Sequence, residues 1–378
     1  MNRITQLDGL RGFFILLITV NHIENPLNRY TQQPFGYASA AEGFVFVSGL
    51  VAGLVYNRKL DRMGAARLKS DILARTRKIY LYHLAVLLVA CAAIYFSPIH
   101  QHHWQPVFHR FLNQPAQALA LGAALLYQPD FHDILPLYCI FLLFVPLLMR
   151  QFRQNRAVLV FGVSIGLWAV SQVGFGFSFK MHNAVSPYFP GFELGNMDMF
   201  AWQLLFVAGV YVASRRYSGN EIRISASALW LCLPLITILI LHRHHVWMYE
   251  SPVTTNLFDK QRLGILRLAN FASLVVVLSL LMKRFPSSLS QPWLVVMGKH
   301  SLPVFSMHIL LIFLLQPPVA YYSHKDPAVA VLFAAFVAAC LYLTARWREK
   351  GVETRKNALA AQAKPESGGL CVQEPVPK

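Results

Sequence analysis

The sequence is poor in charge, and most of the charge it has is positive. Only 13% of the 378 residues are Asp, Glu, Lys or Arg, whereas 56% are hydrophobic. An ordinary soluble domain has about 25% charged residues. This is too little charge to cover a soluble globule of this size, so the composition argues against a soluble enzyme and a disordered chain. It is typical of a multi-pass membrane protein, whose lipid-facing surface needs no charge.

Several chemical signatures are also missing from the sequence. It contains no Walker-type phosphate loop, GxSxG turn or HExxH pair, which disfavours an ATP-driven pump, a hydrolase of that type and a zinc protease. The five cysteines show no CxxC spacing, and four lie within apolar runs, so neither disulfides nor metal ligation is expected. Histidine clusters at 100–103 and 242–245 lack neighbouring acidic ligands, and no metal or permanently bound cofactor is predicted.

Long apolar stretches dominate what is present. A hydrocarbon core about 30 Å thick needs roughly 20 apolar residues in a helix. A shorter apolar stretch at 115–128 is expected to form a re-entrant or interfacial helix. The longer stretches predict an all-α fold of about ten transmembrane helices enclosing a polar cavity, at 11–27, 40–57, 79–98, 134–150, 157–174, 200–214, 226–242, 268–283, 301–317 and 328–346.

The basic residues predict the orientation of these spans. With the N-terminus inside, 26 of the 34 Lys and Arg residues fall in inner segments, eight of them in a predicted loop at 57–79. Such an excess marks cytoplasmic segments, so both termini are expected in the cytoplasm. The sequence Ala38-Ser39-Ala40 resembles a signal-peptide cleavage site but lies too far from the first apolar run. We expect a transmembrane domain at 1–346 and a disordered cytoplasmic tail at 347–378.

The first apolar stretch carries the clearest polar signal. Asp8 and Arg11 lie three residues apart at its inner edge, on one helix face. His22 follows eleven residues later, roughly 16 Å along a helix. An ionisable group at that depth is costly and indicates a functional site, although a neutral histidine hydrogen-bonded between helices would also fit. Asp8 and Arg11 could likewise form only an interfacial ion pair.

Several motifs, in the same order, resemble those of the membrane acyltransferase-3 superfamily. They are QLDGLRG at 6–12 followed by His22, AEGFVFVSG at 41–49, RTRK at 75–78 and MGKHSLPVFSMH at 297–308. With DILPLY and FAWQLLFVAG, they resemble more narrowly the OpgC branch, which succinylates osmoregulated periplasmic glucans. The resemblance covers nearly all of 3–345. It implies an enzyme of the bacterial inner membrane that moves a succinyl group from cytoplasmic succinyl-CoA to a hydroxyl of a periplasmic glucan.

The resemblance also implies that Arg11 and His22 are essential, and the position and charge of other residues suggest further roles in the donor and catalytic sites. His22 would activate the acceptor hydroxyl as a general base, or carry the acyl group itself. Glu42 would orient His22 and His308 would assist, although Glu42 could be a solvated headgroup-level carboxylate and His308 a satisfied buried histidine. The phosphates of acyl-CoA would bind to Arg11, Arg75, Arg77 and Lys78. A role in setting the membrane orientation could alone explain most of the basic residues at 57–79.

On the acceptor side, Arg267 would recognise the succinyl carboxylate, unless it is a lipid-phosphate anchor. Trp202 and Gln203 would bind the sugar, although an interfacial aromatic belt would also explain Trp202. Asp8 is a further candidate substrate contact. The expected partners are acyl-CoA, the glucan and membrane lipids, with a second copy of the chain possible and nucleic acid excluded. Two rival functions stay open: acetyl transfer to another envelope polysaccharide, and glycan transport or export, although no internal repeat typical of transporters is evident.

Overall fold

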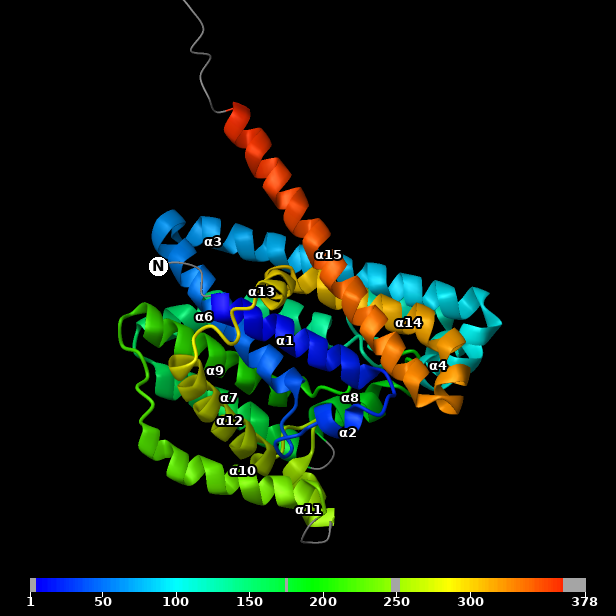
Figure 1. Ribbon diagram of the computed structural model, residues 1–378, viewed down its shortest axis with the longest axis horizontal. Helices are drawn as coiled ribbons and strands as arrows, with labels where there is room; N and C mark the ends of the chain where they lie inside the picture. Colours follow the sequence, from blue (N-terminus) through cyan, green and yellow to red (C-terminus); the bar gives the residue numbers. More distant parts are fainter. Residues whose placement is uncertain (1–4, 174–175, 246–251, 363–378) are drawn as a thin grey trace, which may run out of the picture.

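The computed structural model describes residues 5–173, 176–245 and 252–362 (Figure 1). Within these ranges the chain is helical, with one isolated β-bridge between Tyr127 and Glu193 and no β-strand, which confirms the predicted all-α fold. The elements are α1 (Thr5–His22), α2 (Asn28–Thr31), α3 (Ala40–Phe96), α4 (Pro98–Asn113), α5 (Pro115–Ala123), α6 (Ile134–Arg153), α7 (Ala157–Gln172), α8 (Gly176–Val185), α9 (Met199–Tyr217), the 3-10 turn η1 (Ala226–Ala228), α10 (Leu229–Arg243), α11 (Pro252–Phe258), α12 (Ile265–Arg284), α13 (Pro292–Lys299), α14 (Ser301–Lys325) and α15 (Pro327–Gln362).

Six of the described helical segments are long and apolar enough to cross a membrane, and the bent pair α7 and α8 would make a seventh. The six are α3, α6, α10 with η1, α12, α14 and α15. The 57-residue α3 contains the predicted span 40–57 and most of the predicted span 79–98. Helix α9 contains the predicted span 200–214 and α1 overlaps the predicted span 11–27, but neither belongs to the six. The protein is therefore a multi-pass membrane protein.

The structure differs from the predicted elements in four places. Helix α1 ends at His22, so residues 23–27 of the first predicted span are not helical. The basic stretch at 57–79, predicted to be a loop, is helical within α3 and bends only at Gly64 (φ 75°), where glycine tolerates a conformation that side chains disfavour. Helix α4 was not predicted. The predicted disorder from residue 347 onward is wrong for 347–362, because α15 continues to Gln362 through a stretch without proline. Residues 363–378 lie outside the described part. The nine-residue α5 is too short to span, as expected for 115–128.

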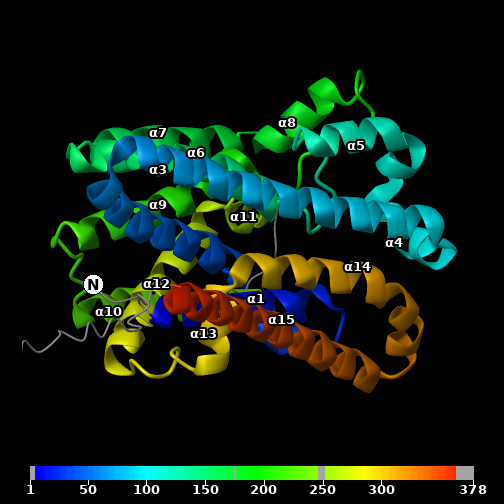
Figure 2. The ribbon, with the colours of Figure 1, turned by 90° about the horizontal axis from the view of Figure 1, so that it is seen from above.

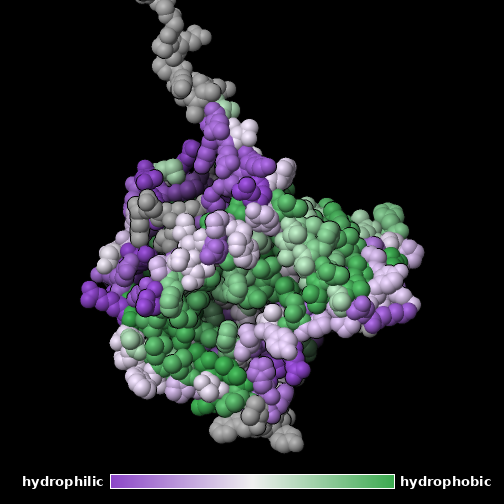
Figure 3. All heavy atoms as spheres, viewed as in Figure 1, coloured by the Kyte–Doolittle hydropathy of each residue, from purple (hydrophilic) through white to green (hydrophobic). Residues whose placement is uncertain are grey.

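The segments expected on the cytoplasmic side gather at one end of the molecule. In Figure 2 the bend of α3, the turns that follow α6 and α9, and the end of α15 lie toward the left-hand end. The connections from α3 to α4 and from α14 to α15 lie at the right-hand end. Figure 3 shows a broad hydrophobic band between hydrophilic regions, as expected for a surface that faces lipid at its middle and water at its ends.

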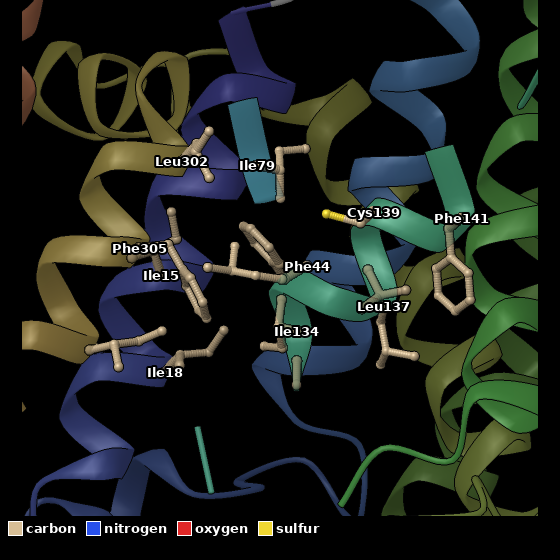
Figure 4. Packing of buried hydrophobic residues seen from close by; sticks show 14 of the residues in the cluster. Ile15, Ile18, Phe44, Ile79, Ile134, Leu137, Cys139, Phe141, Leu302 and Phe305 are labelled. Atoms are coloured by element: carbon tan, nitrogen blue, oxygen red, sulfur yellow. The ribbon is translucent and has the colours of Figure 1, made fainter. Parts of the chain in front are cut away.

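Helix α1 is held in the centre by close packing against α13. A Cβ atom added at Gly12 would lie 2.1 Å from the Leu294 backbone carbonyl oxygen. One added at Gly298 would lie 1.7 Å from the Asp8 backbone carbonyl oxygen. Only glycine allows two backbones to approach this closely. Since α14 begins directly after α13, this contact also fixes the start of α14 beside α1. Apolar side chains of α1, α14, α3 and α6 fill the space between these helices, including Ile15, Phe305, Phe44 and Ile134 (Figure 4).

Candidate active site

Two polar contacts join α1 to α14. Near the start of both helices, Arg11 Nη2 donates a hydrogen bond to Ser301 Oγ at 2.5 Å. Further along, His22 Nδ1 lies 3.0 Å from His308 Nε2. Because residue numbers increase from one contact to the other on both helices, α1 and α14 run in the same direction. The structure thus brings together His22 and His308, two of the three residues predicted to act in catalysis.

The geometry of the imidazole pair determines which nitrogen could do chemistry. His308 is fully buried, whereas His22 is partly exposed. If His22 Nδ1 carries the proton and donates it to His308 Nε2, the opposite nitrogen of His22 has a free lone pair. In that tautomer His22 can accept a proton from a bound hydroxyl, and His308 holds the ring in position. In the other tautomer His22 Nε2 carries hydrogen and cannot act as a base.

An aromatic side chain that sequence reasoning missed contacts this pair. The ring of Phe131 lies 4.3 Å from that of His22, centroid to centroid, and Trp104 and Phe313 pack behind it. Phe131 has a φ of +69°, which is unfavourable for a bulky residue and is typical of functional loops. The sequence held a signal, because three polar residues surround Phe131 immediately before the apolar stretch of α6.

Glu42 has a different partner from the one predicted. Its Oε1 pairs with Arg267 Nε at 2.5 Å, and its Oε2 accepts a hydrogen bond from the Ser39 backbone N–H at 2.9 Å. Both Glu42 and Arg267 are almost completely buried. Among the described residues, the hydrogen-bond partner of His22 is His308, so the geometry does not support Glu42 as the group that orients His22. Arg267 already has a carboxylate partner within the protein.

A rigid loop presents Lys260 toward the same region. Lys260 is exposed, yet it is close enough to interact electrostatically with both His22 and Glu42. Trp202 Nε1 and the Asp198 backbone N–H each donate to the Gln261 carbonyl oxygen at 3.0 Å, which fixes the loop. Lys260, which was not among the predicted site residues, therefore adds positive charge to the region of the catalytic candidates.

The predicted sugar-binding residues are placed inside the protein. Trp202 is fully buried, with its indole N–H bound to the loop at Gln261, so its ring offers no free face for stacking. Gln203 bonds to Ser164 through both ends of its amide. Asp8 is buried where α1 packs against α13, at the opposite end of α1 from His22. These contacts engage Trp202 and Gln203 within the protein, and Asp8 lies far from His22 along α1.

Two cavities lie near the start of α14. The larger, about 570 Å³, is lined by basic side chains that include the predicted Arg75 and Lys78. The smaller, about 30 Å³, is lined by Arg11 and Ser301 together with apolar side chains. Arg75 and Leu302 line both cavities, so the two are adjacent. Arg77, predicted with the other phosphate ligands, is exposed and lines neither.

Packed aromatic rings separate these cavities from the imidazole pair. Phe305 lines the smaller cavity and also contacts His308, with ring centroids 5.5 Å apart. Phe44 stacks on Phe305 at 5.9 Å, and both rings fill the space between α14 and α6 in Figure 4. Neither cavity is lined by His22 or His308. A donor that entered from the larger cavity would have to displace these rings to reach His22.

One histidine of each cluster is engaged in hydrogen bonds within the protein. His100 bonds to Ser97 Oγ and to the Leu314 carbonyl oxygen, and His242 bonds to the Tyr37 hydroxyl. Within residues 5–173, 176–245 and 252–362, no three His, Cys, Asp or Glu residues are grouped so that they could hold a metal ion.

Comparison with known proteins gives one match. A family model described as OpgC protein matches residues 3–351, which include α1 through most of α15, the imidazole pair and all the predicted site residues. No curated protein and no solved structure matches the chain. Since the family match extends over most of the sequence, the chain belongs to the OpgC protein family.

Proposed function

We propose that the protein transfers a succinyl group from cytoplasmic succinyl-CoA to a hydroxyl of a periplasmic glucan, across the bacterial inner membrane. Family membership supports a role in modifying osmoregulated periplasmic glucans. The observation that carries the acyl-transfer chemistry is the contact between His22 and His308 within membrane-spanning structure. About ten helical crossings with both ends in the cytoplasm would place the two cavities on the donor side, and Lys260 on the acceptor side.

The reaction needs a base but no metal. The hydroxyl oxygen of the glucan attacks the thioester carbonyl carbon, and a C–O bond forms as the C–S bond breaks. His22 Nε2 takes the hydroxyl proton and returns it to the departing sulfur, so the products are the succinyl ester and free CoA thiol. His308 Nε2 accepts the hydrogen bond from His22 Nδ1 throughout, and so stabilises the imidazolium that forms.

Recognition of the succinyl carboxylate requires a cation near the imidazole pair, since a buried charge must be paired. Arg267 Nη2 is buried and has no hydrogen-bond partner among the described residues. Its ion pair with Glu42 already balances the arginine charge. Lys260, which is exposed, would supply the additional positive charge, and Arg267 would contribute a hydrogen-bond donor.

The test uses the purified full-length protein in detergent with glucan and either succinyl-CoA or acetyl-CoA. We expect release of free thiol with succinyl-CoA, and a succinyl ester on the glucan by mass spectrometry. His22→Ala should abolish turnover, whereas His102→Ala, which removes an exposed histidine, should not. Folded His22→Ala protein that turns over normally would disprove the mechanism. Preferential use of acetyl-CoA would favour the acetyltransferase alternative, and glucan movement across sealed vesicles without thiol release would favour a transporter.

A further inference from the structure

The part of α15 beyond residue 346 forms one wall of the larger cavity. This α15 extension (347–362) is anchored at two points. Arg348 Nη2 donates to the Tyr82 hydroxyl on α3 at 2.9 Å. Glu349 binds Lys299 and lies 2.6 Å from His300 Nε2, at the junction of α13 and α14. The start of the extension is therefore held in place, and the cavity lies between it and side chains of α3, α13 and α14.

The lining of this cavity is strongly basic. The cavity measures about 570 Å³, within the roughly 300–1,000 Å³ of typical small-molecule sites. Among the described residues that line it there is no acidic side chain. Its cationic side chains come from α3, α13 and the α15 extension, and they are Arg75, Lys78, Lys299, Arg348, Lys350 and Arg355.

The positions on α15 are suited to a ligand with several separate phosphates. Arg348 and Arg355 are seven residues apart, so they lie two turns apart on one helix face. Guanidinium groups bind phosphate through two parallel hydrogen bonds, whereas a lysine acts as a point charge. Trp347, also on the lining, adds an exposed aromatic ring on which a base could stack.

We infer that the α15 extension binds the 3′-phosphate and diphosphate of the CoA nucleotide, with Arg348 and Arg355 as its principal ligands. This inference rests on the proposed function for the identity of the ligand. Bound there, the nucleotide lies outside the apolar interior, and Arg75 and Leu302 mark where its thioester arm passes toward Arg11. A lipid phosphate could satisfy part of the same chemistry, so the test includes both sources.

The experiment measures binding of 3′,5′-ADP to the purified full-length protein in detergent without lipid. The test variant is Arg348→Gln/Arg355→Gln. The matched control is Arg62→Gln/Arg223→Gln, which removes the same charge from two exposed arginines that do not line the cavity. We expect at least tenfold weaker binding for the test variant and less than a twofold change for the control. In turnover assays the test variant should raise KM for succinyl-CoA without changing kcat, because the nucleotide does not react.

Equal binding of 3′,5′-ADP by both variants would overturn the inference, and so would an absence of binding by the wild-type protein. If only vesicles rich in phosphatidylglycerol bind, and the test variant loses that binding, the cavity is a lipid site and the inference is wrong. Nucleotide binding without turnover would retain the site but refute the proposed function. Turnover with an unchanged KM in the test variant would retain the proposed function but refute the nucleotide site.

Discussion

His22 Nδ1 and His308 Nε2 lie 3.0 Å apart on neighbouring helices that run in the same direction. The two nitrogens share one proton in their hydrogen bond, and its position decides whether the outer nitrogen of His22 is a base or a donor. His308 is fully buried, so its ring cannot turn freely to release His22. The pair therefore links the packing of α14 to the chemistry proposed for α1.

Removing His308 should slow the reaction without preventing substrate binding. We expect His308→Leu to lower kcat by about 10- to 100-fold, less than the roughly 10²–10⁴-fold contribution of a general base itself. The reason is that His22 would lose the acceptor that selects its active tautomer. Steady-state kinetics with succinyl-CoA and glucan would measure kcat and KM separately.

His308→Gln provides the control for this prediction, because its side-chain oxygen can accept the same hydrogen bond. It should recover part of the lost kcat and part of the wild-type pH profile, which a purely structural role would not require. Equal kcat in the leucine variant and the wild type would show that His308 does not position His22.

The buried ion pair between Glu42 and Arg267 should be sensitive to the loss of one partner alone. We expect Glu42→Gln to destabilise the protein by about 3–5 kcal/mol, because it leaves the arginine charge uncompensated. The double variant Glu42→Leu/Arg267→Met should regain most of that stability, since neither charge then remains buried. Thermal unfolding in detergent measures both effects. A double variant less stable than the single one would argue that the pair itself stabilises the fold.

The sequence was sufficient to predict most of the long apolar helices, but it could not predict which side chains meet. Long apolar runs identify helices such as α6 and α14 because a spanning segment must hide its backbone polar groups. His22 and His308 were each recognised from local motifs, yet their contact joins residues 286 positions apart. Glu42 was assigned to His22 because no local feature revealed Arg267 as its partner. The α15 extension was missed because its polar composition resembles that of a disordered tail.

A carboxyl group in the segment between α8 and α9 should make stability depend on pH. Burial raises the pKa of Glu193 to about 7 from a usual value of 4.5. Arg110 opposes this shift, since its Nε lies 3.3 Å from Glu193 Oε2. A raised pKa means that the folded state binds the proton more tightly. The stability from Glu193 is thus fully present below about pH 4.5 and is lost as pH rises through about 7.

Glu193→Gln should remove this pH dependence. We expect the variant to lose less stability than the wild type between pH 4.5 and 8, and to unfold at the same or a higher temperature at pH 8. Thermal unfolding at a series of pH values checks this, with Glu221→Gln as a control on an exposed carboxyl. Parallel pH curves for wild type and Glu193→Gln would contradict the prediction.

The close packing of α1 against α13 gives a prediction in which two identical substitutions have opposite effects. Gly162 on α7 has no atom within 4 Å of an added Cβ, so Gly162→Ala should be neutral or stabilise by up to about 1 kcal/mol through helix propensity. Gly298→Ala gains the same propensity, but its methyl group would overlap the Asp8 carbonyl oxygen at 1.7 Å. The backbones must separate, which should cost about 1–3 kcal/mol.

Because α13 leads directly into Ser301, the separation should also lengthen the contact between Ser301 and Arg11, and KM for succinyl-CoA should rise. Unfolding temperatures and KM values for the two variants test both effects, and Gly298→Ala with wild-type stability and KM would show that this contact does not position Arg11.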